Sequence, residues 1–187
     1  MVATNQLASR FRNVAKRAMK LISGGQGGVD RAALDVALAR GIEYGGWCPQ
    51  GGWAEDFPTP PGLLARYSNL KETPLADPAQ RTDWNVRDAD ACLILVDAGG
   101  VEVSAGTTLA QDLAHRYRKP LMVVNLDDPD ALNRAALWLR VQQARHGSGL
   151  TLAIGGPRES EAPGIYARAV TFIGALVEGE RSARGAC

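Results

Sequence analysis

The glycine-rich run at residues 23–31, with the sequence SGGQGGVDR, constrains the fold of this chain more than any other feature. An apolar stretch (19–22) precedes the run and a helical pattern (32–40) follows it. A strand, a glycine-rich turn and a helix in this order present backbone N–H groups to an anion, because glycine adopts positive φ and the first turn of a helix leaves its donors unpaired. The run therefore predicts an anion-binding loop made of Gly24, Gly25, Gln26, Gly27, Gly28, Asp30 and Arg31.

The spacing of these glycines excludes two familiar phosphate-binding motifs. It does not give the G-x-G-x-x-G pattern of dinucleotide-binding folds, and no Lys-Ser or Lys-Thr pair follows, as a P-loop requires. The same glycines also suit a purely structural role, in which they let the helix pack closely against the sheet. Both interpretations stay open on the motif alone.

Strand and helix patterns alternate after residue 18. Apolar runs predict strands at 20–23, 42–47, 91–96, 121–126 and 150–154, and helical periodicity predicts helices at 30–40, 77–88, 106–118, 130–144 and 164–178. This order is typical of an α/β fold with right-handed crossovers, so we expect a Rossmann-like, doubly wound, mainly parallel sheet of about five or more strands flanked by helices. The strands at 91–96 and 121–126 are expected to be buried, and segment 48–76 is expected to hold little regular structure.

Length and composition predict one domain. A chain of 187 residues with 45% hydrophobic content suits a single Rossmann-like ligand-binding domain (19–179), with a basic N-terminal arm (1–18) and a C-terminal tail (180–187). The net charge of +1 gives no basic face for nucleic acid, and no apolar run is long enough to cross a membrane. The 3 cysteines lack C-x-x-C spacing, which argues against a disulfide framework or a metal site and favours the cytoplasm.

Two further glycine-containing loops follow predicted strands, at 97–108 and 155–164. Because ligands bind at the carboxyl ends of parallel strands, we expect these loops to meet the first one at a single edge of the sheet. The second loop offers Ser104, Gly106, Thr107 and Thr108, of which Thr107 or Thr108 alternatively caps the helix. The third offers Gly156, Arg158 and Glu159. Arg158 suits a phosphate or carboxylate, or else pairs with Glu159 or Glu161.

Four residues outside these loops are further candidates for ligand contact. Arg81 and Asn85 lie one turn apart on a predicted helix, facing either the cleft or solvent. Trp47 and Cys48 follow the second strand, where the tryptophan stacks on a planar ring or packs under the long loop, and the thiol is a soft ligand or a small buried group. No nucleophile lies beside a base in the sequence, so no catalytic residue is predicted.

Several segments together resemble the molybdenum cofactor carrier protein family. They are GGQGGVDRAALD (24–35), GWCP (46–49) with AED (54–56), QRTDWNVRDAD (80–90), GT (106–107) and GPRESEAPGIY (156–166). The resemblance implies a carrier of molybdenum cofactor (molybdopterin), or of a related phosphorylated pterin or nucleotide, with molybdoenzymes as recipients. This chain departs from the family in having Gly27 where a threonine is usual, and in an apparent insertion at 58–67.

The family is similar in fold to the cytokinin-activating phosphoribohydrolases of the lysine-decarboxylase-like group. Those enzymes carry Pro-Gly-Gly-x-Gly-Thr-x-x-Glu, and here Ala110 stands at the glutamate position. Because alanine transfers no proton, the resemblance favours a binding protein over a hydrolase. The alternatives are a nucleotide-processing enzyme that uses Asp30, Glu55 or Glu159 as acid or base, and a nucleotide-ligand sensor. The fold relatives also imply a homo-oligomer, a dimer or tetramer.

Overall fold

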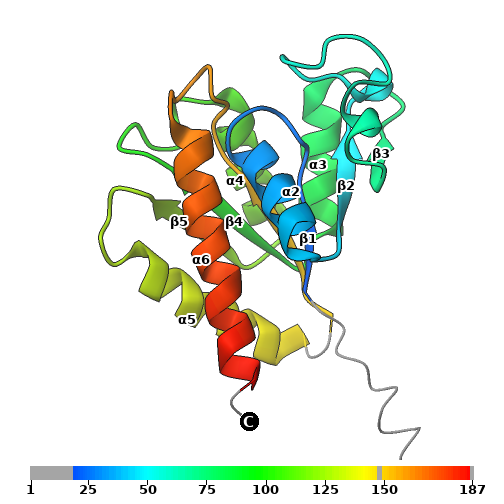
Figure 1. Cartoon of the computed structure of the whole chain (residues 1–187). Helices are drawn as coiled ribbons and strands as arrows, with labels where there is room; N and C mark the ends of the chain where they lie inside the picture. Colours follow the sequence, from blue (N-terminus) through cyan, green and yellow to red (C-terminus); the bar gives the residue numbers. More distant parts are fainter. Residues whose placement is uncertain (1–18, 147–148, 186–187) are drawn as a thin grey trace, which may run out of the picture.

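A six-stranded parallel sheet forms the centre of the computed structural model, which describes residues 19–146 and 149–185 (Figure 1). The strand order is β3-β2-β1-β6-β4-β5, and every pair of neighbours runs parallel. The strands are β1 Lys20–Ile22, β2 Tyr44–Cys48, β3 Leu70–Glu72, β4 Ala91–Val96, β5 Leu121–Asn125 and β6 Thr151–Gly155. The predicted α/β class with a parallel sheet is confirmed.

Helices cover both faces of the sheet, as a doubly wound fold requires. They are α2 Val29–Arg40, α3 Pro78–Asp88, α4 Ala105–Arg116, α5 Ala131–His146 and α6 Ile165–Gly185, with short 3₁₀ helices η1 Gln50–Gly52 and η2 Gly62–Ala65. Helix α6 packs against α2 and α5 on one face, and α3 packs against α4 on the other (Figure 1). None of the described helices is long and apolar enough to cross a membrane.

The hydrophobic core is split by the sheet into two clusters. The larger one contains Leu21, Leu93 and Leu152, each 0% exposed, and lies against α2, α5 and α6. The smaller one contains the strand residues Cys92 and Ala153 and lies against α3 and α4. Successive strand residues point to opposite faces, so one apolar strand such as β4 supplies both clusters.

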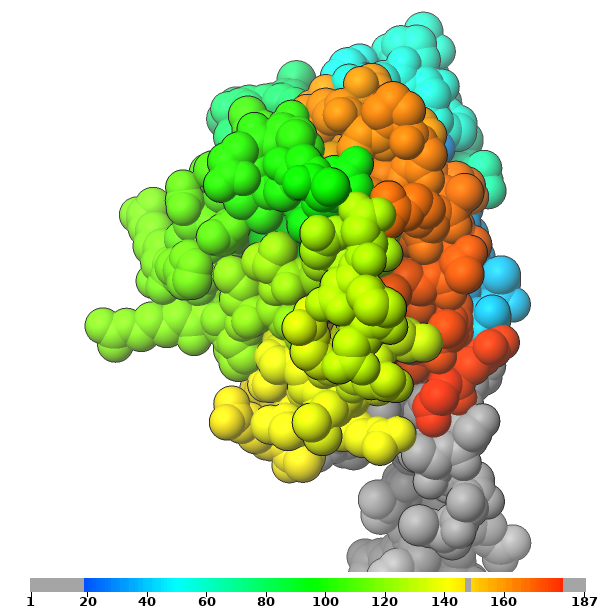
Figure 2. Space-filling view, turned by 90° about the vertical axis from the view of Figure 1, so that its left-hand side faces the viewer, coloured from blue at the N-terminus to red at the C-terminus, as the bar shows by residue number. Residues whose placement is uncertain are grey.

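The expectation that segment 48–76 holds little regular structure missed one short strand. Segment 48–76 contains an edge strand, β3, which pairs with β2 through Trp47 and Lys71. Its sequence, LKE, has one buried residue and two exposed ones, so no apolar run indicates a strand. The expectation that the strand at 121–126 is buried was wrong: this strand is β5, which lies at the opposite edge of the sheet, and Val124 is its only buried residue. Figure 2 shows the side of the molecule on which β5 and α5 face outward.

The predicted domain ends have different outcomes. The basic arm (1–18) lies outside the described residues. Helix α6 runs to Gly185, beyond the predicted boundary at 179, so the backbone of the predicted tail continues the last helix as far as residue 185. Residues 186–187 lie outside the described part of the chain.

Segment 49–67 is fastened to the body of the domain. The carboxylate of Asp35 on α2 accepts hydrogen bonds from the hydroxyl groups of Tyr67 (2.7 Å) and Tyr166 (2.8 Å), and from Arg66 (2.8 Å). Tyr67 is 0% exposed. This long connection between β2 and β3 is therefore an ordered wall beside the carboxyl ends of β1 and β2.

Candidate functional site

A cavity of about 280 Å³ lies at the carboxyl ends of β1 and β6 and along residues 92–94 of β4, beside the first turns of α3 and α4. From this point the strand order extends in both directions, to β2 and β3 on one side and to β5 on the other. Such a switch point is where open α/β sheets bind ligands. Of the predicted site residues, those that line the cavity are Gly24, Gln26, Asp30, Arg81, Asn85, Ser104, Gly106, Thr107, Gly156 and Arg158.

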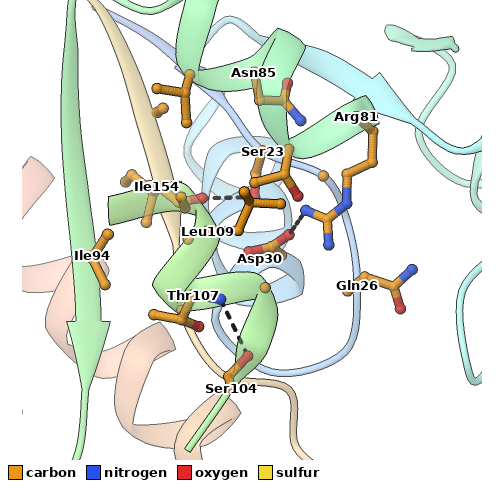
Figure 3. A pocket seen from close by; sticks show the side chains of 18 of the residues that line it. Ser23, Gln26, Asp30, Arg81, Asn85, Ile94, Ser104, Thr107, Leu109 and Ile154 are labelled. Carbon is orange, nitrogen blue, oxygen red and sulfur yellow. Dashed lines mark hydrogen bonds and ion pairs between the residues drawn. The ribbon is translucent and has the colours of Figure 1, made fainter. Parts of the chain in front are cut away.

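The start of α4 forms the polar end of the cavity. Ser104 caps the helix, because its Oγ accepts a hydrogen bond from the N–H of Thr107 at 3.3 Å (Figure 3). The expectation that Thr107 or Thr108 caps this helix was wrong, since a hydroxyl accepts best from the N–H two or three residues further along the chain. The hydroxyl of Thr108 instead donates to the Val101 carbonyl at 3.1 Å, away from the cavity.

Because Ser104 caps α4, the hydroxyl of Thr107 is not used as a cap. Thr107 is 2% exposed, it lines the cavity, and its Oγ1 has no hydrogen-bond partner among the described residues. Two other lining residues share this property, at Arg81 Nε and Gln26 Oε1. A buried polar atom without a partner costs free energy, so three such atoms around one cavity make this cavity a candidate site for a polar ligand.

Arg81 and Asp30 form a buried ion pair across the cavity. The distance from Arg81 Nη1 to Asp30 Oδ2 is 2.7 Å, and the two side chains are 12% and 7% exposed (Figure 3). Burial raises the pKa of Asp30 above its ordinary value, while Arg81 and the N–H of Gly156 act in the opposite direction. The guanidinium lies so close over Gly24 that a Cβ at that position would overlap it.

Arg158 brings a second cation to the cavity, at its rim. The sequence offered Glu159 or Glu161 as side-chain partners, but the guanidinium binds Glu55 instead, with 2.5 Å between Nη1 and Oε1. Glu161 accepts only the backbone N–H of Arg158, at 2.9 Å. Glu159 accepts the N–H groups of Gly164 and Tyr166 at the start of α6, so its carboxylate turns away from the cavity.

Apolar side chains also line the cavity. They come from α3, β4, α4 and β6, and include Val86, Cys92, Leu109, Ala110 and Ala153. Ala110 therefore lies in the cavity wall, at the sequence position where the related hydrolases carry glutamate. Sequence reasoning missed the other four residues, because an apolar residue in a cavity wall has the same pattern as one in the core.

The cavity thiol is Cys92 and not the predicted Cys48. Burial raises the pKa of Cys92 to about 12, so this thiol is protonated at neutral pH. Cys48 is the last residue of β2, where it is 0% exposed and its Sγ contacts the Lys71 carbonyl at 3.5 Å. Burial is also the main cause that raises the pKa of Cys48, to about 11. The position of Cys48 agrees with one of the two alternatives from the sequence, in which its thiol is a small buried group and not a ligand.

The glycines of the first loop serve chain packing more than the sequence indicated. Gly28 has φ 84°, and a Cβ there would overlap the Pro157 carbonyl. The same carbonyl accepts the N–H of Val29 at 3.2 Å. The β6–α6 loop therefore covers the start of α2, and Gly25, Gly27 and Gly28 do not line the cavity. A Cβ at Gly27 would meet nothing within 4 Å.

Arg31 and Trp47, two other predicted contacts, also lie outside the cavity. Arg31 is 6% exposed; its guanidinium donates to the Gly25 carbonyl (2.9 and 3.0 Å) and to the Asp56 carboxylate (2.8 Å). Trp47 donates from Nε1 to Asp88 at 2.7 Å and lies edge-on to Trp84, with 4.6 Å between the ring centroids. Arg31 therefore fastens the β2–β3 connection to the first loop, and Trp47 packs against α3.

Asn85 and Ser23 hold the walls of the cavity in place. The side-chain amide of Asn85 bonds both the N–H and the carbonyl of Trp47, at 2.8 and 2.9 Å, which joins α3 to β2. Ser23, which sequence reasoning did not select, donates to the Ile154 carbonyl at 2.8 Å and joins β1 to β6. No signal in the sequence marks either bond, because the partners are backbone atoms of other strands.

A doubly wound parallel sheet with a polar cavity at its switch point defines a Rossmann-like protein with a candidate small-molecule site. The sequence profile of the circularly permutated YpsA SLOG family matches residues 21–177, and the chain belongs to this family. No curated protein matches it. A solved structure named "putative molybdenum carrier protein", from Syntrophus aciditrophicus SB, is similar, with 35% identity and a TM-score of 0.72 over 86% of this chain and 96% of that chain. The resemblance to the molybdenum carrier proteins is thereby confirmed.

Proposed function

We propose that this protein binds a phosphorylated small molecule in the cavity and carries it. The ligand is molybdenum cofactor or a related phosphorylated pterin or nucleotide. The observation that carries the proposal is the buried hydroxyl of Thr107 at the start of α4. Neither this hydroxyl nor the Nε of Arg81 in the same cavity has a hydrogen-bond partner within residues 19–146 and 149–185. Phosphate oxygens accept hydrogen bonds from hydroxyl groups, guanidinium groups and the N–H groups of a first helical turn.

Within this proposal, the phosphate lies against the first turn of α4. The N–H groups of Ala105 and Gly106 belong to that turn, and both residues line the cavity. Arg81 and Arg158 supply positive charge. The apolar lining residues, among them Val86 and Leu109, contact the flat ring of the ligand.

The carrier role rests on two supports. Ala110 lies in the cavity wall in place of the glutamate of the related hydrolases, so the wall has no acid at this position. The similar Syntrophus protein is named as a molybdenum carrier. The proposal includes transfer of the ligand to molybdoenzymes in the cytoplasm, and a dimer or tetramer as the assembled form, which light scattering measures.

Replacing Thr107 with valine weakens binding in this account, because it removes a hydrogen bond to a charged phosphate. Such bonds contribute about 1.5–3 kcal/mol, which is roughly a tenfold to hundredfold loss of affinity. Calorimetry with a pterin monophosphate and with AMP, each beside its unphosphorylated counterpart, measures the effect. Thr108→Val is the matched control, because that hydroxyl already donates to Val101 and is expected to leave affinity unchanged. Failure of the wild-type protein to bind either phosphorylated probe contradicts the proposal.

A further inference from the structure

The guanidinium of Arg81 is bonded on one side only. Within the described residues its one hydrogen bond runs from Nη1 to Asp30 Oδ2, at 2.7 Å. A Cβ at Gly24 would overlap Nη1 and approach Cδ, so the side that carries these two atoms faces the first loop. Nε and Nη2 form the opposite edge. Since Arg81 lines the cavity and its first side is occupied, the Nε–Nη2 edge is the one left for a ligand.

This edge needs an acceptor. Nε is buried and has no hydrogen-bond partner among residues 19–146 and 149–185, and the side chain as a whole is 12% exposed. A buried donor without a partner costs free energy. A guanidinium holds its N–H groups in one plane, so two neighbouring acceptors in that plane satisfy Nε and Nη2 together. The edge therefore fits a ligand group with two adjacent acceptors.

Asp30 determines which kind of acceptor pair suits this edge. Its carboxylate is 7% exposed and already bonds the same guanidinium. A second anion on Nε and Nη2 would lie near this buried negative charge, and like charges repel more strongly where water is excluded. A neutral pair of acceptors makes the same two hydrogen bonds without that repulsion. The edge thus suits the rim of a heterocyclic ring better than a carboxylate or a second phosphate.

We propose that Arg81 is a specificity-determining residue, which recognises a ring edge made of a carbonyl oxygen and a neighbouring ring nitrogen. The inference rests on the proposed function and deepens it by naming the class among nucleotides: guanine nucleotides in preference to adenine nucleotides. Arginine donates to O6 and N7 of guanine in this bidentate way where proteins recognise bases. Adenine presents an amino group in place of O6, so one donor of Arg81 would face another donor and stay unsatisfied.

Gln26 supports the same preference. It is 1% exposed, lines the cavity, and donates from Nε2 to the Trp53 carbonyl at 3.1 Å. This bond fixes the orientation of the amide, so Oε1 is an acceptor, and it has no partner in the described part of the chain. Figure 3 shows Gln26 and Arg81 on the same side of Asp30. Guanine carries an N1–H donor beside O6, where adenine carries an acceptor, so an acceptor at position 26 also favours guanine.

The test is calorimetry on the full chain with GMP, AMP and 7-deaza-GMP, in which a C–H group replaces N7 of guanine. All three probes carry the same ribose and phosphate, so they differ in the ring alone. Wild type is expected to bind GMP about tenfold more tightly than AMP, because one bidentate pair of hydrogen bonds distinguishes bases to this extent. It is expected to bind 7-deaza-GMP more weakly than GMP, because one donor of Arg81 then loses its acceptor.

Arg81→Lys separates the ring contact from the ion pair. Lysine keeps a positive charge beside Asp30 but has no planar pair of N–H groups. The variant is expected to retain a preference for GMP of about threefold or less. Arg87→Lys is the matched control, since it makes the same substitution on the same helix, at an exposed arginine that pairs with Asp88 outside the cavity. This control is expected to keep the wild-type preference.

The outcomes separate this inference from the proposed function. If wild type binds none of GMP, AMP and the pterin monophosphate, the proposed function fails, and the inference fails with it. If wild type binds AMP or 7-deaza-GMP as tightly as GMP, or binds the pterin monophosphate but not GMP, the inference is overturned and the proposed function stands. These comparisons need only wild-type protein, so they apply even if thermal melting shows that Arg81→Lys is unfolded. An unchanged preference in folded Arg81→Lys, or an equal loss of preference in Arg87→Lys, also overturns the inference.

Discussion

Replacing Arg81 with methionine is expected to lower the free energy of unfolding by about 3–5 kcal/mol at neutral pH, the largest effect of any single change considered. The change leaves the carboxylate of Asp30 buried, 7% exposed, without its counter-charge. Urea denaturation measures the loss. Arg168→Met is the control, because it breaks an exposed pair with Asp127 and is expected to cost less than about 1 kcal/mol.

The loss of unfolding free energy caused by Arg81→Met is expected to become smaller as the pH falls. Burial raises the pKa of Asp30, and removal of Arg81 takes away the main group that opposes this rise. A carboxyl group whose pKa is higher in the folded state binds protons more tightly there, so the folded state gains relative stability as the pH decreases. Denaturation at about pH 7.5 and about pH 5 is expected to show a smaller difference from wild type at the lower pH. Equal stability of variant and wild type at the higher pH would show that Asp30 does not depend on Arg81.

The second large effect is expected for replacement of Gly28. The same replacement at Gly27 is the control. Gly28→Ala is expected to cost about 2–4 kcal/mol, because the new Cβ meets both an unfavourable positive φ and the carbonyl of Pro157. Gly27→Ala is expected to be neutral or stabilising by less than about 1 kcal/mol, since a Cβ there meets nothing within 4 Å. Thermal and urea unfolding of the two variants measure the difference. Similar stabilities would contradict the structural role of Gly28.

The sequence predicted those features of the fold that depend on local chemistry. The apolar run of β4 is fully buried, with the predicted bounds. The predicted helix at 77–88 is α3, which Asp77 caps by accepting the N–H of Ala79 at 2.9 Å, with Pro78 in its first turn. In contrast, β3 depends on pairing with β2 and not on its own residues, so its sequence carried no signal.

The candidate site was predictable as a region but not in its contacts. Three loops after strands do meet at one edge of the sheet, and ten of the predicted residues line the cavity there. The partners of their side chains come from distant parts of the chain: Glu55 and Arg158 are 103 positions apart, and Asp30 and Arg81 are 51 apart. These pairings determine which residues line the cavity and which pack beneath it. No local sequence pattern encodes them.

The most direct test of the account is the position of a bound phosphate relative to α4. In a ¹⁵N-labelled sample titrated with a pterin monophosphate or AMP, we expect saturable shifts of the backbone amide signals of Ala105, Gly106 and Thr107. The amide of Val29 is expected to change little, because it donates to the Pro157 carbonyl. Saturable shifts at α4 that are absent with the unphosphorylated counterparts are the result this account predicts. Saturable shifts at the start of α2 with an unchanged α4, or no saturable shift with either probe, would contradict it.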